Sequence, residues 1–471
     1  MTRDGTLYQQ LANKLVSRIE QAIYAPGDRL PGVRALSDQE GVSVSTVVSA
    51  YHWLEDQGYA EARPRSGYYI RERHEERLPE PGPSRPQSAP TPITGQEMVL
   101  QLMKASRNPG IVQLGTAVPD TSFLPLAAVE RAVSRVAHQQ RADAFAYEAP
   151  QGVPALRRQI ARHMAGYGHM ANPDDLIVTN GCQEAVSIAL RAVTNPGDTV
   201  AIESPTFYGL LQVLNGLGLE ALEIPTDPKA GISVEALEFA LEQWSVKACV
   251  VVPNYSNPLG YCMPEARRRN LLTLLRHHNV PLIEDDVYGD LGFTHSRPGH
   301  CRSLAPEDDV FVCSSFSKTL SPGLRIGWVL PPKPRFETVE YIKYVSNLSS
   351  PTSLQLAVAD LLESGRYQRH LRANRGQYEA AVTRMMNAVT RLFPSGTRVT
   401  RPEGGFVIWV ELPGDIDTFE LAGRALEQGV SFSPGPIFSA NRKYRNCLRL
   451  SCACRWDGRV EKALATLARM L

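Results

Sequence analysis

The sequence predicts a small helical module at the N-terminus, followed by a larger α/β domain with a mostly parallel sheet that ends in a small α+β lobe. Three observations support this fold class. Apolar residues recur every four positions between residues 7 and 23, a proline-rich stretch follows near residue 80, and short β-branched runs alternate with helical patterns beyond residue 170. A chain of 471 residues has room for two or three such folding units.

The first 70 residues have the order of elements of a winged helix-turn-helix. The first helix is predicted by one apolar stripe, which consists of Leu7, Leu11, Leu15, Ile19 and Ile23. Prolines and a glycine within 26–31 end it, and two more helices are expected, over about 33–40 and from a Ser43 or Ser45 cap to Gln57. Two short stretches then predict a β-hairpin. This order is typical of a DNA-binding winged helix.

A proline-rich segment follows between Pro79 and Pro92. Its prolines lie among Ser, Gly and Thr, with almost no apolar side chain. Because such a composition cannot bury enough surface to order itself, we expect a semi-stiff spacer, which would span on the order of 40–60 Å if largely extended. That reach would place the N-terminal module on a neighbouring subunit. We therefore divide the chain into a module over 1–72, a linker over 73–97 and a domain over 98–471.

The remainder of the chain alternates short strands with helices, which predicts βαβ units with helices on both faces of the sheet. The expected strands are Leu176 to Thr179, Thr199 to Ile202, Ala248 to Val252, Pro281 to Glu284 and Val310 to Cys313. After about Lys333 we expect a long helix near 350–393 and strands over 405–411 and 447–452. We assign this tail to the small α+β lobe.

The composition excludes several classes of protein. Apolar runs are interrupted well short of a membrane span, and the polar N-terminus does not resemble a secretory signal, so we expect a cytoplasmic protein without membrane contact. The eight cysteines form no Cys-x-x-Cys pair and have no His at metal-ligand spacing, which favours reduced thiols and no metal site. The net charge of +1 argues neither for nor against a nucleic-acid partner.

Polar groups follow several of the expected strands at their carboxyl ends, where α/β sheets bind ligands. Lys318 follows the strand that ends near Cys313, and Arg325 lies seven residues further on. Asp285 ends another apolar run, with Tyr288 three residues later. An amine, a carboxylate, donors to a ring oxygen and an anion site are the groups that pyridoxal phosphate requires. A lone lysine is usually a solvated charge, but this one lies among Ser, Pro, Gly and Arg after an apolar strand.

Other parts of the pattern are weaker when taken singly. Asn257 follows a strand and could donate to the ring oxygen, although Asn-Pro by itself is only a turn signal. Gly181 precedes a helix whose first N–H groups would form an anion site. Phe207 could stack on the cofactor or be a core aromatic. The acidic trio 284–286 could instead be a solvated loop or a metal site.

Residues 100–471 resemble a fold-type I aminotransferase of the class I/II family. The matching positions are Tyr147, Gly181 to Gln183, Phe207, Asn257, Asp285, Tyr288, Ser315, Lys318, Arg325 and Arg449. The resemblance implies that Lys318 is the catalytic residue, which binds pyridoxal 5′-phosphate covalently, and that Asp285 pairs with the ring nitrogen. It also implies that Tyr288 and Asn257 contact the ring oxygen. The implied phosphate site, at the helix start marked by Gly181, consists of Cys182, Gln183, Ser315, Ser317 and Arg325.

The same resemblance implies two further contacts and reveals two departures. Tyr147 is expected to reach the phosphate from the partner subunit of a homodimer, and Arg449 to clamp the carboxylate of the substrate. Arg449 could alternatively be a structural ion-pair residue within its strand. Cys182 stands where Ser or Thr is usual, and Phe207 stands where Tyr is frequent.

Residues 1–70 resemble the GntR-type winged helix. The matching features are Pro26 to Pro31, Val33 and Arg34, Gly41 to Ser43, Thr46 and Val47, Leu54 to Gly58, and Ser66 to Tyr68. Joined by a linker to an aminotransferase-like domain, this module resembles the MocR subfamily, although Val44 stands where that family commonly has Arg and Gly32 where it commonly has Ser. The resemblance implies a double-stranded DNA operator, contacted by Arg34, Ser43, Ser45, Thr46, Arg63, Arg65 and Gly67.

Two functions emerge as hypotheses. The first is a DNA-binding transcription regulator whose cofactor domain senses an amine, an amino acid or the vitamin itself. Residues 1–70 hold seven Lys/Arg and eight Asp/Glu, a net charge of 7 − 8 = −1. DNA binding would therefore depend on a few placed cations. The alternative is that the winged helix serves protein contacts alone. The second hypothesis is a working aminotransferase with an ancillary module, because Lys318, Asp285 and Arg449 are all present.

Overall fold

The computed structural model describes residues 6–20, 23–25, 27–63, 66–71, 78–85, 89–93, 99–100, 104, 108, 110–294 and 296–471. The chain folds as two compact units. One consists of residues 1–77 with 383–391, and the other of residues 78–382 with 392–471. Within the described ranges, no helix combines the length and the apolar character that crossing a membrane requires.

The N-terminal unit is a winged helix-turn-helix, as predicted. Its elements are α1 (Leu7–Glu20), α2 (Val33–Glu40), α3 (Val44–Asp56), β1 (Ala60–Arg63) and β2 (Gly67–Ile70). The helices enclose a core that contains Leu15, Leu36 and Tyr51, and the two strands pair antiparallel. Ser43 caps α3 by accepting a hydrogen bond from the backbone N–H of Thr46 at 3.2 Å. The predicted stripe extends too far, because α1 ends at Glu20 and Ile23 is exposed.

The large unit contains an eight-stranded sheet in the order β4-β11-β10-β9-β8-β5-β6-β7. The strands are β4 (Ile177–Thr179), β5 (Thr199–Ser204), β6 (Glu220–Asp227), β7 (Gly231–Ile232), β8 (Val246–Val251), β9 (Leu282–Asp285), β10 (Val310–Ser315) and β11 (Gly327–Leu330). The central pairs from β10 to β6 are parallel, whereas β11 and β7 run antiparallel to their neighbours. The mostly parallel sheet is therefore confirmed, and each of the five expected strands is present.

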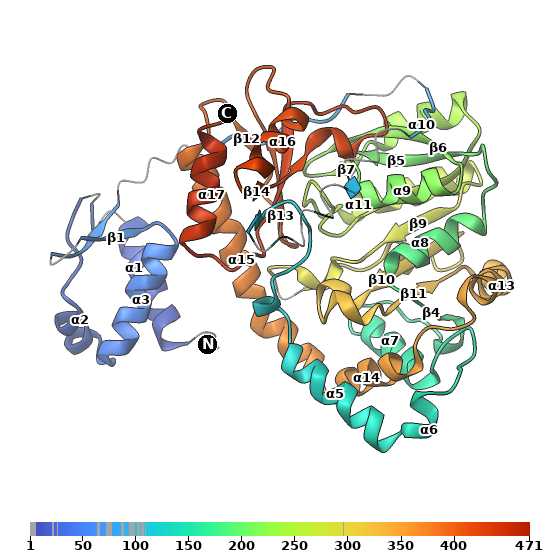
Figure 1. Ribbon diagram of the computed structural model, residues 1–471, viewed down its shortest axis with the longest axis horizontal. Coiled ribbons are helices and arrows are strands. Elements are labelled where there is room, and N and C mark those ends of the chain that lie inside the picture. The colour runs from blue at the N-terminus through green and yellow to red at the C-terminus, as the bar shows by residue number, and fades with distance from the viewer. Residues whose placement is uncertain are drawn as a thin grey trace. The chain divides into compact units, whose positions relative to one another are not determined.

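Helices cover both faces of this sheet (Figure 1). They are α5 (Leu126–Gln139), α6 (Arg141–Ala144), α7 (Pro154–Ala165), α8 (Cys182–Arg191), α9 (Tyr208–Gly216), α10 (Val234–Gln243), α11 (Glu265–His277), α12 (Cys301–Leu304) and α13 (Phe336–Asn347). Alternate residues of β5 show how the faces divide: Ala201 packs with α10 and α11, whereas Val200 and Ile202 pack with α8 and α9. A sheet that is buried on both faces explains why its strands are apolar almost throughout.

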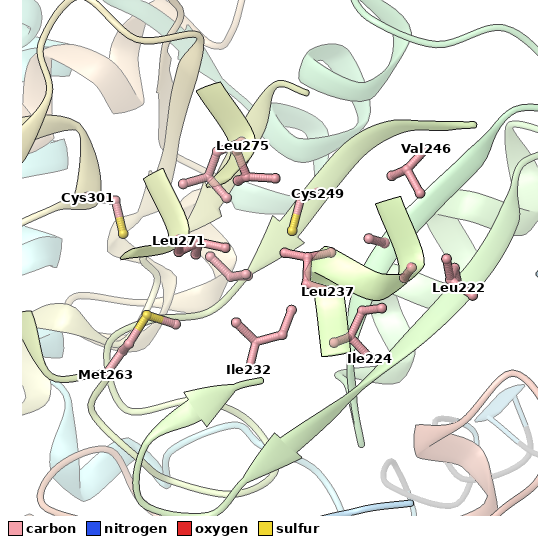
Figure 2. Packing of buried hydrophobic residues seen from close by; sticks show 14 of the residues in the cluster. Leu222, Ile224, Ile232, Leu237, Val246, Cys249, Met263, Leu271, Leu275 and Cys301 are labelled. Carbon is pink, nitrogen blue, oxygen red and sulfur yellow. The ribbon is translucent and has the colours of Figure 1, made fainter. Parts of the chain in front are cut away.

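One of these packed layers is shown in Figure 2, where side chains from the sheet meet those of two helices. Leu222 and Ile224 of β6 and Ile232 of β7 point toward Leu237 of α10, and Leu271 of α11 completes the cluster. These five side chains are at most about 2% exposed, so the layer is a dry core. The layer packs against β6 and β7 at one end of the sheet, next to β5 and β8.

The C-terminal lobe is α+β, as expected, but its long helix is interrupted. Residues 350–393 form two helices, α14 (Thr352–Glu363) and α15 (Arg366–Leu392), because the chain turns at Gly365 with a φ of +66°. The lobe contains a four-stranded sheet in the order β12-β13-β16-β15, and two further helices. These elements are β12 (Arg398–Val399), β13 (Val407–Glu411), β15 (Ser433–Pro434), β16 (Cys447–Ser451), α16 (Thr418–Glu427) and α17 (Gly458–Ala468), with a separate pair of strands, β3 (Val112–Gln113) and β14 (Val430–Ser431).

The described part of the proline-rich segment is not an unordered spacer. The carbonyl of Pro79 accepts a hydrogen bond from Val399 of β12 at 3.0 Å, and the side chain of Arg401 donates to Leu78 O at 2.9 Å. Further along, Thr91 exchanges two backbone hydrogen bonds with Ala221, at 3.0 and 3.1 Å, and so covers part of the edge of β6. For these described residues the expectation of an unordered spacer is wrong, because backbone hydrogen bonds hold them without many apolar side chains.

Candidate functional site

A pocket opens at the carboxyl ends of the parallel strands, because their shared direction brings those ends to one edge of the sheet. About 860 Å³ of space free of protein atoms lies in this pocket and in its open mouth. Many of the residues predicted from the sequence line it, namely Cys182, Gln183, Phe207, Asn257, Asp285, Tyr288, Ser315, Ser317, Lys318 and Arg325. The structure thus brings together residues that are up to about 140 positions apart in the chain.

Lys318 places its amine inside this pocket. It ends a single 3₁₀ turn (Phe316–Lys318) just beyond β10, and its Nζ donates a hydrogen bond to the carbonyl of Ala117 at 2.7 Å. Desolvation, aided by the positive charge of Arg449, lowers the pKa of Lys318 to about 8, although Asp285 opposes the shift. The amine is therefore partly neutral near neutral pH, which is the form that attacks a carbonyl carbon.

Asp285 supplies a carboxylate at the floor of the pocket. It is the last residue of β9, and its Oδ1 accepts hydrogen bonds from Cys182 Sγ at 3.1 Å and from the backbone N–H of Val287 at 3.2 Å. Desolvation raises the pKa of Asp285 to about 6, whereas both hydrogen bonds lower it. The thiol of Cys182 thus turns toward this carboxylate. Its predicted contact with a phosphate stays a prediction, which the backbone N–H at the start of α8 could still make.

Tyr288 and Asn257 form a connected pair of donors. Asn257 Nδ2 donates to the phenol oxygen of Tyr288 at 3.1 Å, and both side chains are buried. Desolvation raises the pKa of Tyr288 above its usual range, so the phenol keeps its proton and remains a donor. The two residues lie beside each other as expected for groups that share one ring oxygen.

Arg449 lies at the base of this network, on β16. Its guanidinium donates to Asn257 Oδ1 at 3.0 Å, to Ser433 Oγ at 3.0 Å and to the carbonyl of Gly115. The side chain is fully buried, its Nε has no hydrogen-bond partner, and it belongs to none of the ion pairs found among the described residues. The structural ion-pair alternative therefore loses support. A buried cation without a counter-charge favours an anionic ligand.

The predicted anion site is built around Gly181, which precedes α8 with a φ of +88°. Arg325 donates to the carbonyl of Asn180 at 2.6 Å and to Ser317 Oγ at 3.4 Å, and Ser315 and Ser317 share a hydrogen bond at 2.8 Å. A Cβ at position 181 would come within 2.5 Å of the Arg325 guanidinium, so only glycine leaves this cradle open. A helix N-terminus, two hydroxyls and a guanidinium fit a phosphate group.

Two predicted cofactor contacts differ in outcome. Phe207 lies at the start of α9 and lines the pocket, with its ring packed over Gly209, where a Cβ would come within 2.3 Å of the ring. Tyr147 is 88% exposed and is not part of the pocket lining found among the described residues. A single chain therefore does not bring Tyr147 to the site, and its contact across a dimer remains a prediction.

Sequence reasoning missed the hydrogen-bond acceptors of Lys318 and Arg449 that lie far from them in the sequence. The carbonyls of Gly115 and Ala117 bind Arg449 and Lys318, and Ser433 contacts Arg449 from β15. Backbone carbonyls in a loop carry no residue-type signal, so no pattern could have revealed the first two. Ser433 is one serine among many, and only its pairing opposite Arg449 in the sheet distinguishes it.

The predicted DNA-binding residues occupy two places in the N-terminal unit. Arg34 on α2 is exposed, and so are Ser43 and Ser45 at the start of α3, where Thr46 is half-buried. Ser43 Oγ lies 2.8 Å from the hydroxyls of both Ser45 and Thr46. The start of α3 therefore presents three hydroxyls, two of them exposed, which suits contact with phosphates or base edges.

The hairpin, or wing, carries the other predicted contacts. Arg63 donates to Glu61 Oε1 at 2.8 Å and lies over the ring of Tyr69, 4.3 Å from its centre. Gly67 opens β2 with a φ of +106°, and the side chain of Arg29 lies beside it, a basic residue that sequence reasoning did not assign to the wing. Arg65 lies outside the described residues. The charge of Arg63 is thus partly balanced before any DNA is bound.

Comparisons with known proteins agree with both halves of this description. Residues 109–467 match the family model of aminotransferase class I and II, and residues 7–70 match that of bacterial regulatory proteins of the gntR family. The chain is 42% identical to the HTH-type transcriptional regulator YjiR of Escherichia coli K12 over 448 residues, which cover 95% of each chain. It is 38% identical to the HTH-type transcriptional regulator YdcR of the same organism over 470 residues, 98% of each chain.

A solved structure gives a view of the larger domain. LysN, the alpha-aminoadipate aminotransferase of Thermus thermophilus, complexed with N-(5′-phosphopyridoxyl)-L-leucine, is 28% identical with a TM-score of 0.73, over 79% of this chain and 93% of its own. That match leaves about a fifth of this chain uncovered, whereas the two regulators match along nearly the whole chain. The chain therefore belongs to the GntR-type transcription regulators that carry a class I and II aminotransferase domain, the MocR-type architecture.

Proposed function

We propose that this regulator acts in the cytoplasm as a homodimer on a specific DNA operator, holds pyridoxal 5′-phosphate on Lys318, and senses an amino compound or the cofactor itself. The observation that carries the proposal is the pocket around Lys318, which combines an amine, a carboxylate and an anion cradle in one chain with a winged helix. Catalysis alone would not require the winged helix, whereas regulation requires both parts.

The residues of the pocket fit the cofactor group by group. Arg325 and the two hydroxyls beside it would hold the phosphate, and Asp285 would pair with the ring nitrogen. Tyr288 and Asn257 would donate to the ring oxygen. When bound, the cofactor supplies an electron sink for bonds at an attached amino group. The phosphopyridoxyl ligand in the LysN structure supports this assignment.

Arg449 indicates the chemistry of the effector. Its buried and uncompensated charge contributes to the low pKa of Lys318, so the guanidinium and the amine are electrostatically close. A ligand with both an amino and a carboxylate group could meet Lys318 with one end and Arg449 with the other. We therefore favour an amino acid among amino compounds.

The ordered part of the linker gives a physical route from such a ligand to the DNA-binding unit. Arg449 and Val399 belong to the same four-stranded sheet, and Val399 donates its backbone hydrogen bond to Pro79. The linker is also bonded to β6 of the large sheet through Thr91. A shift of the lobe around Arg449 would therefore pull on the segment that continues into the winged helix, which is the coupling that regulation needs.

The presence of Lys318, Asp285 and Arg449 together also favours a second candidate function, a working aminotransferase. The two functions differ in the step after ligand binding. A transaminase converts a 2-oxo acid into an amino acid with repeated turnover, whereas a sensor needs only to bind. Turnover of a 2-oxo acid that does not affect DNA binding would favour the enzyme.

The cofactor assignment predicts covalent attachment at Lys318. Borohydride reduction of the protein loaded with pyridoxal 5′-phosphate, followed by digestion and mass spectrometry, should place the cofactor on this lysine. Lys318→Ala should abolish attachment, and the exposed Lys229→Ala should leave it unchanged because Lys229 is paired with Glu80 at the surface. Attachment to another lysine would contradict the assignment.

The low pKa of Lys318 predicts the pH dependence of that attachment. Since only the neutral amine reacts, the rate should rise with pH and level off above about 8, instead of rising toward the usual lysine value. Arg449→Gln should move the midpoint upward, because Arg449 lowers this pKa, and Arg445→Gln, at an exposed ion pair with Asp417, should not. Stopped-flow absorbance between pH 6 and 10, normalised to a free alkylamine, measures this. A midpoint near 10.5 would refute it.

The dimer proposal predicts that Tyr147 acts across the subunit boundary. Sedimentation should show a dimer, and Tyr147→Phe should weaken cofactor retention by about tenfold, the cost of one charge-assisted hydrogen bond to phosphate. Tyr341→Phe, at another exposed tyrosine, serves as the matched control and should have no effect. A monomer that keeps the cofactor fully would argue against a shared site.

The geometry of the wing predicts opposite effects of two neighbouring substitutions on DNA binding. Arg63→Ala should weaken binding to selected and random fragments alike and reduce the salt slope by about one, as loss of one phosphate contact does. Glu61→Gln should strengthen binding to both, because it removes the negative charge that partly balances Arg63. Gel shifts at two salt concentrations, on fragments selected from a random pool by the full-length protein, would test this. Equal binding of all fragments by the unmodified protein would contradict a specific operator.

A further inference from the structure

The segment that carries Asp285 and Tyr288 also carries two acidic residues that do not belong to the described pocket lining, Asp286 and Asp290. Of this segment, residues 285, 287 and 288 line the pocket. Asp286 and Asp290 instead make their contacts with polar side chains of the protein interior. The mechanism proposed above uses neither of them, so their role needs its own explanation.

Each of these carboxylates is bound by several buried donors. Asp286 accepts hydrogen bonds from Asn254 Nδ2 at 2.7 Å and from His300 Nε2 at 2.7 Å. Asp290 contacts the groups that come from α7 and α15, which are His163 Nε2 at 3.0 Å and Tyr367 O–H at 2.6 Å. The donors come from four separate parts of the chain, which fixes both carboxylates in the interior.

Arg297 connects the two. Its terminal nitrogen lies 2.5 Å from Asp286 Oδ2, and its Nε lies 2.6 Å from Asp290 Oδ1. The guanidinium also rests on the ring of Tyr167, 3.7 Å from the ring centre. One planar group therefore joins both ends of the segment 286–290 through two different nitrogens, whereas a lysine ammonium has a single nitrogen and no fixed plane.

The electrostatics agree with a closed, ionised bridge. Desolvation would raise the pKa of Asp286, but the charges of Arg297 and His300 outweigh it and hold that pKa at about 2. The pKa of Asp290 is also lowered, because His163 and Arg297 together outweigh desolvation. Both carboxylates therefore stay charged at neutral pH and keep their attraction to Arg297.

Gly289 shows how tightly the bridge closes. A Cβ at this position would lie 2.4 Å from Asp286 Oδ1 and 2.7 Å from the terminal nitrogen of Arg297. No side chain fits there unless the bridge opens. The absence of a side chain at residue 289 is thus a requirement of the bridge, not of the backbone, whose φ is not in the left-handed region.

We propose that Arg297 is a positioning residue of the cofactor site: by bridging Asp286 and Asp290, it holds the segment 285–290 in the turn that presents Asp285 and Tyr288 to the pocket together. Asp285 directly precedes Asp286, one end of the bridge, and Tyr288 lies in the chain between Asp286 and Asp290. The consequence for cofactor binding rests on the function proposed above, whereas the effect on the turn itself does not.

The proposal makes a different prediction from a merely structural ion pair. A structural pair would lower stability when lost but leave each folded molecule with an unchanged site. A positioning residue must alter the two backbone hydrogen bonds of the turn, from Asp286 N–H to Cys313 O and from Leu291 N–H to Tyr288 O, both 2.8 Å long. It must also alter the fit of the cofactor in molecules that remain folded.

The test compares full-length Arg297→Lys and Gly289→Ala with Arg276→Lys, a control in which the same change is made at an exposed pair with Asp308. Hydrogen exchange of the cofactor-free protein should show the amides of Asp286 and Leu291 exchanging about tenfold faster in the first two variants. Fluorescence titration should show the Kd for pyridoxal 5′-phosphate rising about tenfold or more, with a shifted pH midpoint of the bound absorption band. The control should match the unmodified protein.

Folded variants with unchanged exchange and an unchanged Kd would overturn the proposal. If Arg297→Lys does not fold, Asp290→Asn decides by the same readouts, because it keeps the size of the side chain but removes the negative charge at one end of the bridge. If the unmodified protein does not bind pyridoxal 5′-phosphate, the proposed function fails, and the exchange of the two amides alone then decides whether Arg297 holds the turn.

Discussion

The parallel pairing of β8, β9 and β10 is the constraint on which the rest of the large unit depends. It sends Asn257, Asp285 and Lys318 to the same edge of the sheet, although they are far apart in the chain. The same pairing leaves both faces of the sheet apolar, so helices must cover each face, and the start of α8 then lies at that edge as well. The carboxylate, the amine and the anion cradle therefore converge as a consequence of strand direction.

This explains why much of the fold and the pocket could be predicted from the sequence. Alternating strands and helices determine the sheet, and polar residues at or just beyond the carboxyl ends of its strands then lie near one edge, as Asp285 and Lys318 illustrate. The features that could not be predicted depend on contacts between distant segments. Neither the carbonyl of Ala117 that accepts from Lys318 nor the hydrogen bond from the Cys182 thiol to Asp285 leaves a local pattern in the sequence. Tyr147 is exposed and lies outside the described pocket lining of the single chain, so its predicted role is not tested by these contacts.

The linker shows where composition misleads. Its scarcity of apolar side chains correctly indicates that it cannot form a core of its own, but a chain also has backbone groups, and neighbours with unpaired edges can bind them. Pro79 lacks an N–H group yet keeps the carbonyl that Val399 binds, and Thr91 pairs with β6 through both of its backbone groups. A segment can therefore be proline-rich and still have described residues that are hydrogen-bonded to two sheets.

Arg449 shows how a ligand could act on that connection. A ligand shifts an equilibrium only through contacts that differ between two states, so a sensor needs a group whose partners change on binding. Under the proposed function Arg449 would be such a group, since a carboxylate would compete with Asn257 for its guanidinium, and Asn257 Nδ2 also donates to Tyr288. The buried guanidinium has three hydrogen-bond acceptors but no described anionic partner, and its Nε is unpaired. Arg449 also belongs to the sheet whose edge strand binds the linker. Under the proposed function, the free energy of pairing a ligand carboxylate with Arg449 would therefore be available to shift the position of the sheet to which the linker is hydrogen-bonded.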